Sequence, residues 1–136
     1  MKITFWGCRG SIPAPLSGAE VREKIVRAVR ECPSGTDPEE WLDSMPLGVG
    51  STYGGETSCV EVSSGERRLI LDAGSGIRKL GLRMMAGQEY TRPVHILFSH
   101  FHWDHIQGLP FFVPLLKPDT EINFYSGRKD IKEFIS

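Results

Sequence analysis

The stretch Ser99-His100-Phe101-His102-Trp103-Asp104-His105 decides how the rest of the chain is interpreted, because it holds three of its four histidines. It directly follows residues 94–98, an apolar run with the length and composition of a buried strand. Residues two apart at a strand end point to the same face, so His100 and His102 can approach one metal ion together. Asp104 and His105 follow where the chain must turn. They can reach a second ion or a water molecule between two ions.

These four side chains are of the kinds that bind hydrolytic metals. Imidazole suits zinc, iron or nickel, and a neighbouring carboxylate extends the choice to manganese. Such an ion lowers the pKa of a bound water to about 7 and polarises the bond under attack. Histidines that bind no metal are the alternative. Four ligand-type residues between positions 100 and 105, at a strand-to-loop junction, favour the metal.

The composition is that of an ordinary globular domain. The chain has 136 residues, enough for one modest core, and a net charge of −1, which gives no general attraction to nucleic acid or anionic membranes. Three cysteines without regular spacing do not suggest a disulfide framework. The first residues turn polar too early for a signal peptide, and no apolar run approaches the length of a membrane span. We therefore expect a cytoplasmic protein with no membrane partner.

The remaining pattern predicts an α/β fold with a mixed sheet and flanking helices. Strands are expected over residues 3–6, 58–62, 68–71, 94–98 and 121–125. Helices are expected over residues 17–32, 37–42, 77–86, 111–116 and 129–135. The second and third strands should form a hairpin. The first helix carries an apolar stripe that is expected to pack, made of Val21, Ile25, Ala28, Val29 and Cys32.

The pattern His-x-His-x-Asp-His after an apolar strand resembles the signature of the metallo-β-lactamase superfamily. Three glycine-containing segments agree with it, namely residues 7–13, 53–59 and 71–76. Trp103 and the segment 106–112 look most like its phosphodiesterase-like branch, which is similar to transfer-RNA 3′-processing endonucleases and to cyclic-nucleotide and phosphonate-pathway phosphodiesterases. The resemblance covers most of residues 1–136, with a helical insertion at 17–50 that could serve as a lid or an oligomer contact.

The resemblance implies a role for each residue of the motif. His100 and His102 would hold a first divalent ion, and Asp104 and His105 a second. Zinc is the first choice of metal, with Mn²⁺ or Fe²⁺ as alternatives. Asp104 would also orient the hydroxide that attacks the phosphorus of a phosphodiester, in a small molecule, a nucleotide or a nucleic acid. Two alternatives stay open: hydrolysis of an ester, thioester or lactone, and a fragment that binds metal or a partner without catalysis.

Two further residues are candidates for the site. Asp72 ends a predicted strand beside the glycine-rich residues 73–76, where its carboxylate could orient a metal-ligating histidine. Its alternative role is to cap the helix that follows. Arg9 lies in the glycine-rich loop 7–11 and could bind a substrate phosphate, because guanidinium matches phosphate geometry. A surface arginine or an internal ion pair is the alternative for Arg9.

The family pattern also includes later ligands that this sequence lacks, because no histidine follows His105. The family fold is an αβ/βα sandwich of two similar halves, and this chain resembles the first half. We therefore expect an incomplete domain, with one sheet face in need of cover from the missing half, an oligomer or a partner chain. Hydrolysis by these 136 residues alone is left open.

Overall fold

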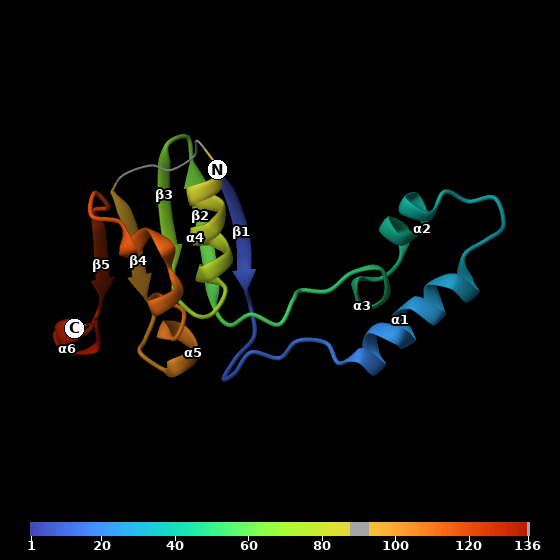
Figure 1. The fold of residues 1–136 in the computed structure, drawn as a ribbon, viewed down its shortest axis with the longest axis horizontal. Helices are drawn as coiled ribbons and strands as arrows, with labels where there is room; N and C mark the ends of the chain where they lie inside the picture. Colours follow the sequence, from blue (N-terminus) through green and yellow to red (C-terminus); the bar gives the residue numbers. More distant parts are fainter. Residues whose placement is uncertain (88–92, 136) are drawn as a thin grey trace. The chain divides into compact units, whose positions relative to one another are not determined.

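The computed structural model describes residues 1–87 and 93–135. They form two compact units (Figure 1). The larger unit joins Met1–Ala14 to the described residues from Gly55 onward, and the smaller unit is Pro15–Gly54. The smaller unit includes the segment 17–50 that the sequence sets apart. That this segment is an insertion stays a prediction.

A mixed five-stranded sheet forms the frame of the larger unit, and its strand order follows the chain. The strands are β1 (Lys2–Gly7), β2 (Cys59–Ser64), β3 (Arg67–Leu71), β4 (Val94–Phe98) and β5 (Ile122–Ser126). The first three strands pair antiparallel, with β2 and β3 forming the predicted hairpin. β3 and β4, and β4 and β5, pair in parallel. The α/β prediction with a mixed sheet is therefore confirmed.

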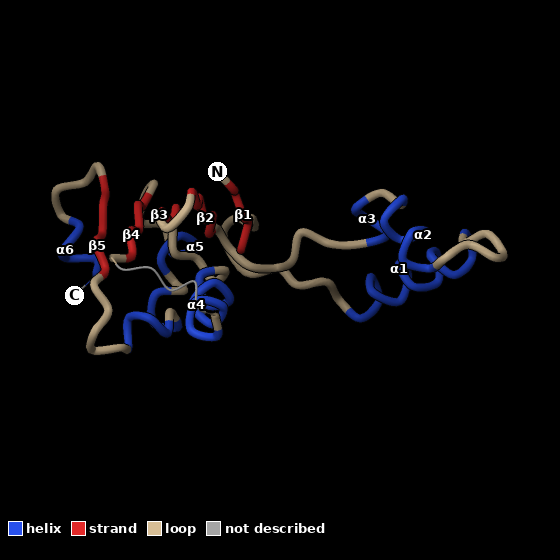
Figure 2. The backbone as a smooth tube through the Cα atoms, turned by 90° about the horizontal axis from the view of Figure 1, so that it is seen from above, coloured by secondary structure: helices blue, strands red, loops and turns tan. Residues whose placement is uncertain are grey.

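α4 (Ile77–Ala86) lies on one side of this sheet (Figure 2). The larger unit also contains α5 (Trp103–Ile106), which follows β4, and α6 (Ile131–Ile135), which follows β5. The single helix predicted over 111–116 is wrong, because two 3₁₀ turns, Leu109–Phe111 and Val113–Leu116, take its place. Proline has no backbone N–H and is tolerated only in the first turn of a helix, so a continuous helix cannot cross Pro114.

The core lies between the sheet and α4. Ile70 and Ile96 from the centre of the sheet are fully buried there, together with Leu80 of α4 and Phe112. Phe112 packs closely against α4 at Gly81, where a Cβ atom would lie only 2.8 Å from the ring. The Phe112 ring can pack against α4 at this point because Gly81 has no side chain.

The opposite face of the sheet is apolar and open to solvent. Ile3 and Phe5 of β1 are 52% and 69% exposed, and Leu97 and Tyr125 are 41% and 42% exposed. The register places these residues along one face, on the side away from α4. His95 lies on the same face and forms a 2.8 Å hydrogen bond with the Tyr125 hydroxyl. An apolar sheet face of this width is normally buried against another layer.

The smaller unit contains three helices: α1 (Gly18–Glu31), α2 (Pro38–Ser44) and α3 (Leu47–Gly50). Ser17 caps α1 through a reciprocal pair of hydrogen bonds with Glu20, which explains why the helix begins there. Asp37 caps α2 by accepting from two backbone N–H groups. Among the helices that the structure describes, none has both the length and the apolarity needed to cross a bilayer.

Three residues of the apolar stripe predicted on α1 stay exposed within the smaller unit, so its packing against another element stays a prediction. Val21, Ile25 and Val29 are 42%, 57% and 73% exposed. The face of α1 that meets α2 and α3 lies one residue earlier in the helical repeat. There Lys24 donates to two backbone carbonyls of the segment 48–51, and the Ala28 carbonyl accepts from the indole of α2. This face lies one step of about 100° around the helix from Ile25 and Val29, and the stripe member Ala28 lies on it.

Phe112 and its neighbour Phe111 offer a direct test of the core, because Phe111 is 61% exposed. Phe112→Ala should lower the free energy of unfolding by about 3–5 kcal/mol, from lost burial and the cavity left behind. Phe111→Ala should cost less than about 1 kcal/mol. Urea unfolding followed by circular dichroism measures both. Equal losses in the two variants would contradict the assigned core.

Candidate metal centre

Parallel pairing of β3 with β4 brings Asp72 and the histidine motif to the same edge of the sheet. Leu71 pairs with Leu97, and the next residue, Asp72, donates its backbone N–H to the Leu97 carbonyl at 2.9 Å. Ser99 and the motif follow directly after β4. Because both strands run in the same direction, the residues that follow them emerge side by side.

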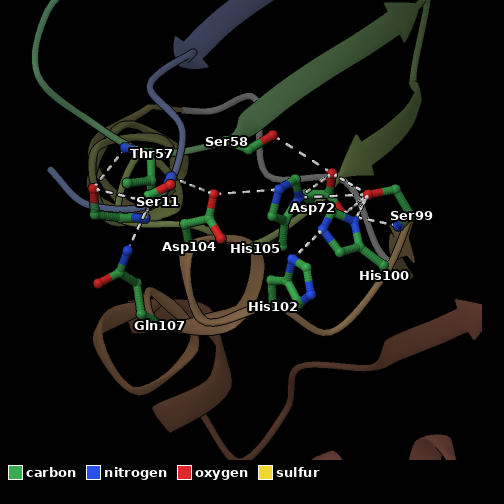
Figure 3. A network of polar contacts seen from close by, with 11 residues as sticks. Ser11, Thr57, Ser58, Asp72, Ser99, His100, His102, Asp104, His105 and Gln107 are labelled. Carbon is green, nitrogen blue, oxygen red and sulfur yellow. Dashed lines mark hydrogen bonds and ion pairs between the residues drawn. The ribbon is translucent and has the colours of Figure 1, made fainter.

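The carboxylate of Asp72 is the hub of this edge (Figure 3). It accepts the Ser99 backbone N–H at 2.8 Å and the Ser99 hydroxyl at 2.8 and 3.0 Å, one distance to each oxygen. The same carboxylate lies 2.8 Å from Nδ1 of His105. Asp72 has a φ of +61°, a left-handed conformation that aspartate tolerates better than most residues. Asp72 does not cap α4, which begins after Gly76 without a side-chain cap.

The histidines of the motif gather beside Asp72 (Figure 3). Nε2 of His100 lies 3.1 Å from Nδ1 of His102, and the ring centroids of His100 and His105 are 4.0 Å apart. Two nitrogens bound to one tetrahedral zinc at the usual length are about 3.3 Å apart. The two facing nitrogens of His100 and His102 therefore fit a shared divalent ion.

Asp104 is 8% exposed, and His105 lies between it and Asp72 (Figure 3). Its Oδ2 accepts the backbone N–H of Ser11 at 2.8 Å and lies 3.5 Å from Nε2 of His105. The hydrogen bond from Ser11 is the main cause that lowers the pKa of Asp104 below its ordinary value. Ser11 has a φ of +66°, so the loop after β1 is held in an uncommon conformation that aims its N–H at Asp104.

A second polar network holds the loops behind the site. The Thr57 backbone N–H donates to the Ser75 hydroxyl at 2.9 Å, and the Ser75 N–H donates to the Thr57 hydroxyl at 2.8 Å. Gln107 also donates to the Thr57 hydroxyl, at 3.0 Å. Thr57 is fully buried, so this exchange satisfies a hydroxyl that would otherwise be costly to bury. The network ties the loop before β2, the loop after β3 and α5 into one support.

Two glycines let these loops approach closely. A Cβ atom at Gly74 would collide with the backbone carbonyl of Asp104, and one at Gly108 would collide with the carbonyl of Gly74. The Gly108 N–H in turn donates to the Ala73 carbonyl at 2.9 Å. The backbone around Asp104 is therefore fixed by contacts that only glycine permits.

Arg9 is exposed, and its backbone places it beside the site. Its N–H donates to the Glu56 carbonyl at 3.0 Å, and it forms an isolated parallel bridge with Thr57. These contacts hold the loop after β1 against the loop before β2. A role for the Arg9 side chain on a substrate phosphate stays a prediction.

The four predicted ligands lie in one cluster, although their assignment as ligands stays a prediction. Within residues 1–87 and 93–135, no group of three His, Cys, Asp or Glu side chains is arranged to hold a metal ion. The pair formed by His100 and His102 is the part of the cluster whose donor atoms face each other. Asp104 and His105 are held beside it by Ser11 and Asp72.

Sequence reasoning missed several residues of this site. Ser11 and Asp104 are 93 positions apart, and Thr57 and Gln107 are 50 apart, so nothing local connects them. Ser99 stands directly before the motif and is the one with a visible signal. Its hydroxyl follows the predicted strand 94–98 and directly precedes the histidines, so a bond from Ser99 to a neighbouring histidine could have been expected.

The comparisons with known proteins point to one family. A family model described as the metallo-beta-lactamase superfamily matches residues 52–122, just over half of the chain. The chain is 30% identical over 76 residues to an atrochrysone carboxyl ACP thioesterase of Paecilomyces divaricatus, a match that covers 54% of this chain. It is 30% identical over 89 residues to cleavage and polyadenylation specificity factor subunit 3 of Dictyostelium discoideum, which covers 62% of it.

The matches cover only a small part of each relative's own length. The aligned segment is 24% of the thioesterase and 11% of the polyadenylation factor subunit, so the chain corresponds to about a quarter or less of either relative. No solved structure matches the chain.

The pH dependence of stability tests the loop network around Ser75, because Glu56 bonds the Ser75 hydroxyl. Its carboxylate accepts the Ser75 hydroxyl at 2.6 Å and pairs with Lys79 at 3.2 Å, and the Ser75 bond is the main cause that lowers its pKa from the ordinary 4.5. A depressed pKa adds stability that is present above the ordinary pKa and is lost as the pH falls through the lower folded-state value. Glu56→Gln should therefore flatten the fall in the free energy of unfolding below about pH 4.5.

Urea unfolding at a series of pH values measures this slope. Glu66→Gln, in the exposed turn between β2 and β3, controls for the loss of one negative charge. The same acid dependence in wild type and Glu56→Gln would show that the bond from Ser75 does not stabilise the ionised carboxylate.

Proposed function

Because the chain belongs to the metallo-beta-lactamase superfamily, we propose that it forms the metal-binding part of a hydrolase that cleaves phosphodiesters. The observation that carries this proposal is the convergence of His100 and His102, whose facing nitrogens are 3.1 Å apart at the carboxyl edge of the sheet. Asp104 and His105 lie beside this pair in α5, the short helix that begins directly after His102.

The residues present fit divalent ions of the kind that superfamily hydrolases use. His100 and His102 would hold one ion, and Asp104 and His105 a second, with zinc as the first choice and Mn²⁺ or Fe²⁺ as alternatives. When bound, such ions act as Lewis acids that activate water and stabilise charge that develops on the substrate.

The protein's own contribution is orientation. Asp104 is held through Oδ2 by the Ser11 N–H, in a largely buried position. We assign to it the role of accepting a hydrogen bond from the attacking water and so fixing its direction. Its lowered pKa keeps it ionised at neutral pH, which this role requires. Arg9, on the neighbouring loop, is the candidate for binding a phosphate oxygen.

The relatives support two substrate classes. One is named for cleavage and polyadenylation, which favours a phosphodiester in a nucleotide or nucleic acid. The other is named a thioesterase, which makes hydrolysis of a thioester, ester or lactone at the same site the second candidate. A part that binds metal or a partner without catalysis is the third.

The open sheet face bears on partners. Four apolar or aromatic residues remain exposed on it, so we propose that a further polypeptide layer covers it, either the rest of a longer protein or another chain. The four are Ile3, Phe5, Leu97 and Tyr125.

We also propose a cytoplasmic location and no membrane partner. The role of segment 17–50 as a lid or oligomer contact likewise stays a proposal.

A substrate panel with the zinc-loaded chain separates the candidates. The panel contains bis-p-nitrophenyl phosphate, an acyl thioester and a lactone. Hydrolysis by this chain alone stays open; where the loaded chain turns over a substrate, we expect it to be the phosphodiester, at a rate that falls about 100-fold or more in Asp104→Asn. His95→Gln is the matched control, because His95 bonds Tyr125 on the open face and is not one of the four predicted ligands.

Each other outcome has a distinct meaning. Thioester or lactone turnover alone would establish the second candidate. Zinc binding without turnover of any substrate would favour the non-catalytic candidate. A chain that binds no divalent ion would refute the proposed metal centre.

A further inference from the structure

Ser99 makes an unusual set of contacts for a residue next to a metal motif. Its hydroxyl lies 3.0 and 2.8 Å from the two carboxylate oxygens of Asp72. The same oxygen lies 3.0 Å from Nδ1 of His100. One hydroxyl thus connects a carboxylate to a histidine whose other nitrogen faces His102.

The chemistry of the three groups decides which atom carries each proton. An ionised carboxylate only accepts hydrogen bonds, so the single proton of the Ser99 hydroxyl goes to Asp72. The hydroxyl oxygen must then accept from Nδ1 of His100. In a neutral imidazole only one nitrogen carries a proton. With Nδ1 protonated, Nε2 of His100 keeps its lone pair.

We infer that Ser99 is a positioning residue that fixes the Nδ1–H tautomer of His100 and presents the Nε2 lone pair to a shared ion. The inference rests on the proposed function in taking His100 as a metal ligand. The tautomer itself follows from the hydrogen bonds of Ser99 and is independent of any metal.

Asp72 orients a second histidine by the same logic. Nδ1 of His105 lies 2.8 Å from the Asp72 carboxylate and 3.4 Å from the Ser99 hydroxyl, so the carboxylate is its nearer acceptor. His105 then also carries its proton on Nδ1, which leaves Nε2 facing Asp104. One carboxylate therefore sets the orientation of His105 directly and that of His100 through Ser99.

The tautomer matters because of what His100 faces. Its Nε2 lies 3.1 Å from Nδ1 of His102. With a lone pair on Nε2 of His100, this distance fits either a hydrogen bond donated by an N–H of His102 or a metal ion bound between the two nitrogens. A rotated ring or the other tautomer would place an N–H where an ion must bind. Groups that fix ligating histidines in this way are worth about 10- to 100-fold in metal affinity.

The test compares Ser99→Ala with Ser99→Thr and Ser58→Ala. Ser99→Ala removes the hydroxyl but keeps the backbone N–H that anchors Asp72. Ser99→Thr keeps the hydroxyl, and the position is exposed enough for one more methyl group. Ser58→Ala is the matched control, because the Ser58 hydroxyl also reaches Asp72, at 3.5 Å, whereas the hydroxyl that bonds His100 is that of Ser99.

Two readouts are measured. Nitrogen-15 NMR of the metal-free chain reports which imidazole nitrogen of His100 is protonated, with the signal assigned from a His100→Gln sample. Competition with a chromophoric chelator reports the zinc affinity. We expect Nδ1–H and wild-type affinity in Ser99→Thr and Ser58→Ala. In Ser99→Ala we expect the tautomer preference to be lost and the zinc affinity to fall about 10- to 100-fold.

The two readouts separate failure of the inference from failure of the proposed function. An Nε2–H tautomer in the wild type, or an unchanged tautomer in Ser99→Ala, would overturn the role of Ser99 whether or not zinc binds. If no variant binds zinc but the tautomer changes as expected, the positioning role stands and the metal assignment falls. Zinc affinity within twofold of wild type in Ser99→Ala would overturn the link between tautomer and metal binding.

Discussion

The parallel pairing of β3 with β4 is the constraint on which the candidate site depends. It aligns the ends of two neighbouring strands, so that Asp72 and Ser99 leave the sheet side by side. A carboxylate at this position loses much of its hydration, and its oxygens must be satisfied by protein donors. The Ser99 amide, the Ser99 hydroxyl and His105 supply those contacts, and this joins the strand ends to the histidine motif.

The surrounding loops pack around this hub with little freedom. Asp72 and Ser11 both adopt left-handed backbone conformations, which cost energy unless their surroundings impose them. Close contacts at Gly74 and the buried Thr57 hydroxyl bring the loops before β2 and after β3 against α5 and the residue that follows it. A site that must present several ligands at fixed distances benefits from such rigid support. The free-energy cost of these left-handed conformations is offset by burial of the core between the sheet and α4.

Much of the fold could be predicted from the sequence because its signals are local. The apolar run of β4, the hairpin turn at Gly65 and the cap at Ser17 each lie within a few residues of the element they define. The contact between Ser11 and Asp104 could not be predicted, since it joins residues 93 positions apart through the backbone. The stripe on α1 marks the limit of such signals, because periodicity identifies an apolar face but not the element that covers it. For Asp72, the sequence predicted a place near the motif, whereas the hydrogen bonds to Ser99 are seen only in the structure.

A sheet with one covered and one open face thus carries a cluster of metal-ligand side chains at its carboxyl edge. X-ray absorption at the zinc edge of the loaded chain tests most directly whether His100 and His102 bind one divalent ion. We predict a nitrogen or oxygen shell at about 2.0–2.1 Å with imidazole scattering that diminishes in His102→Gln but not in His95→Gln. A zinc spectrum without imidazole scattering, or one unchanged in His102→Gln, would contradict it.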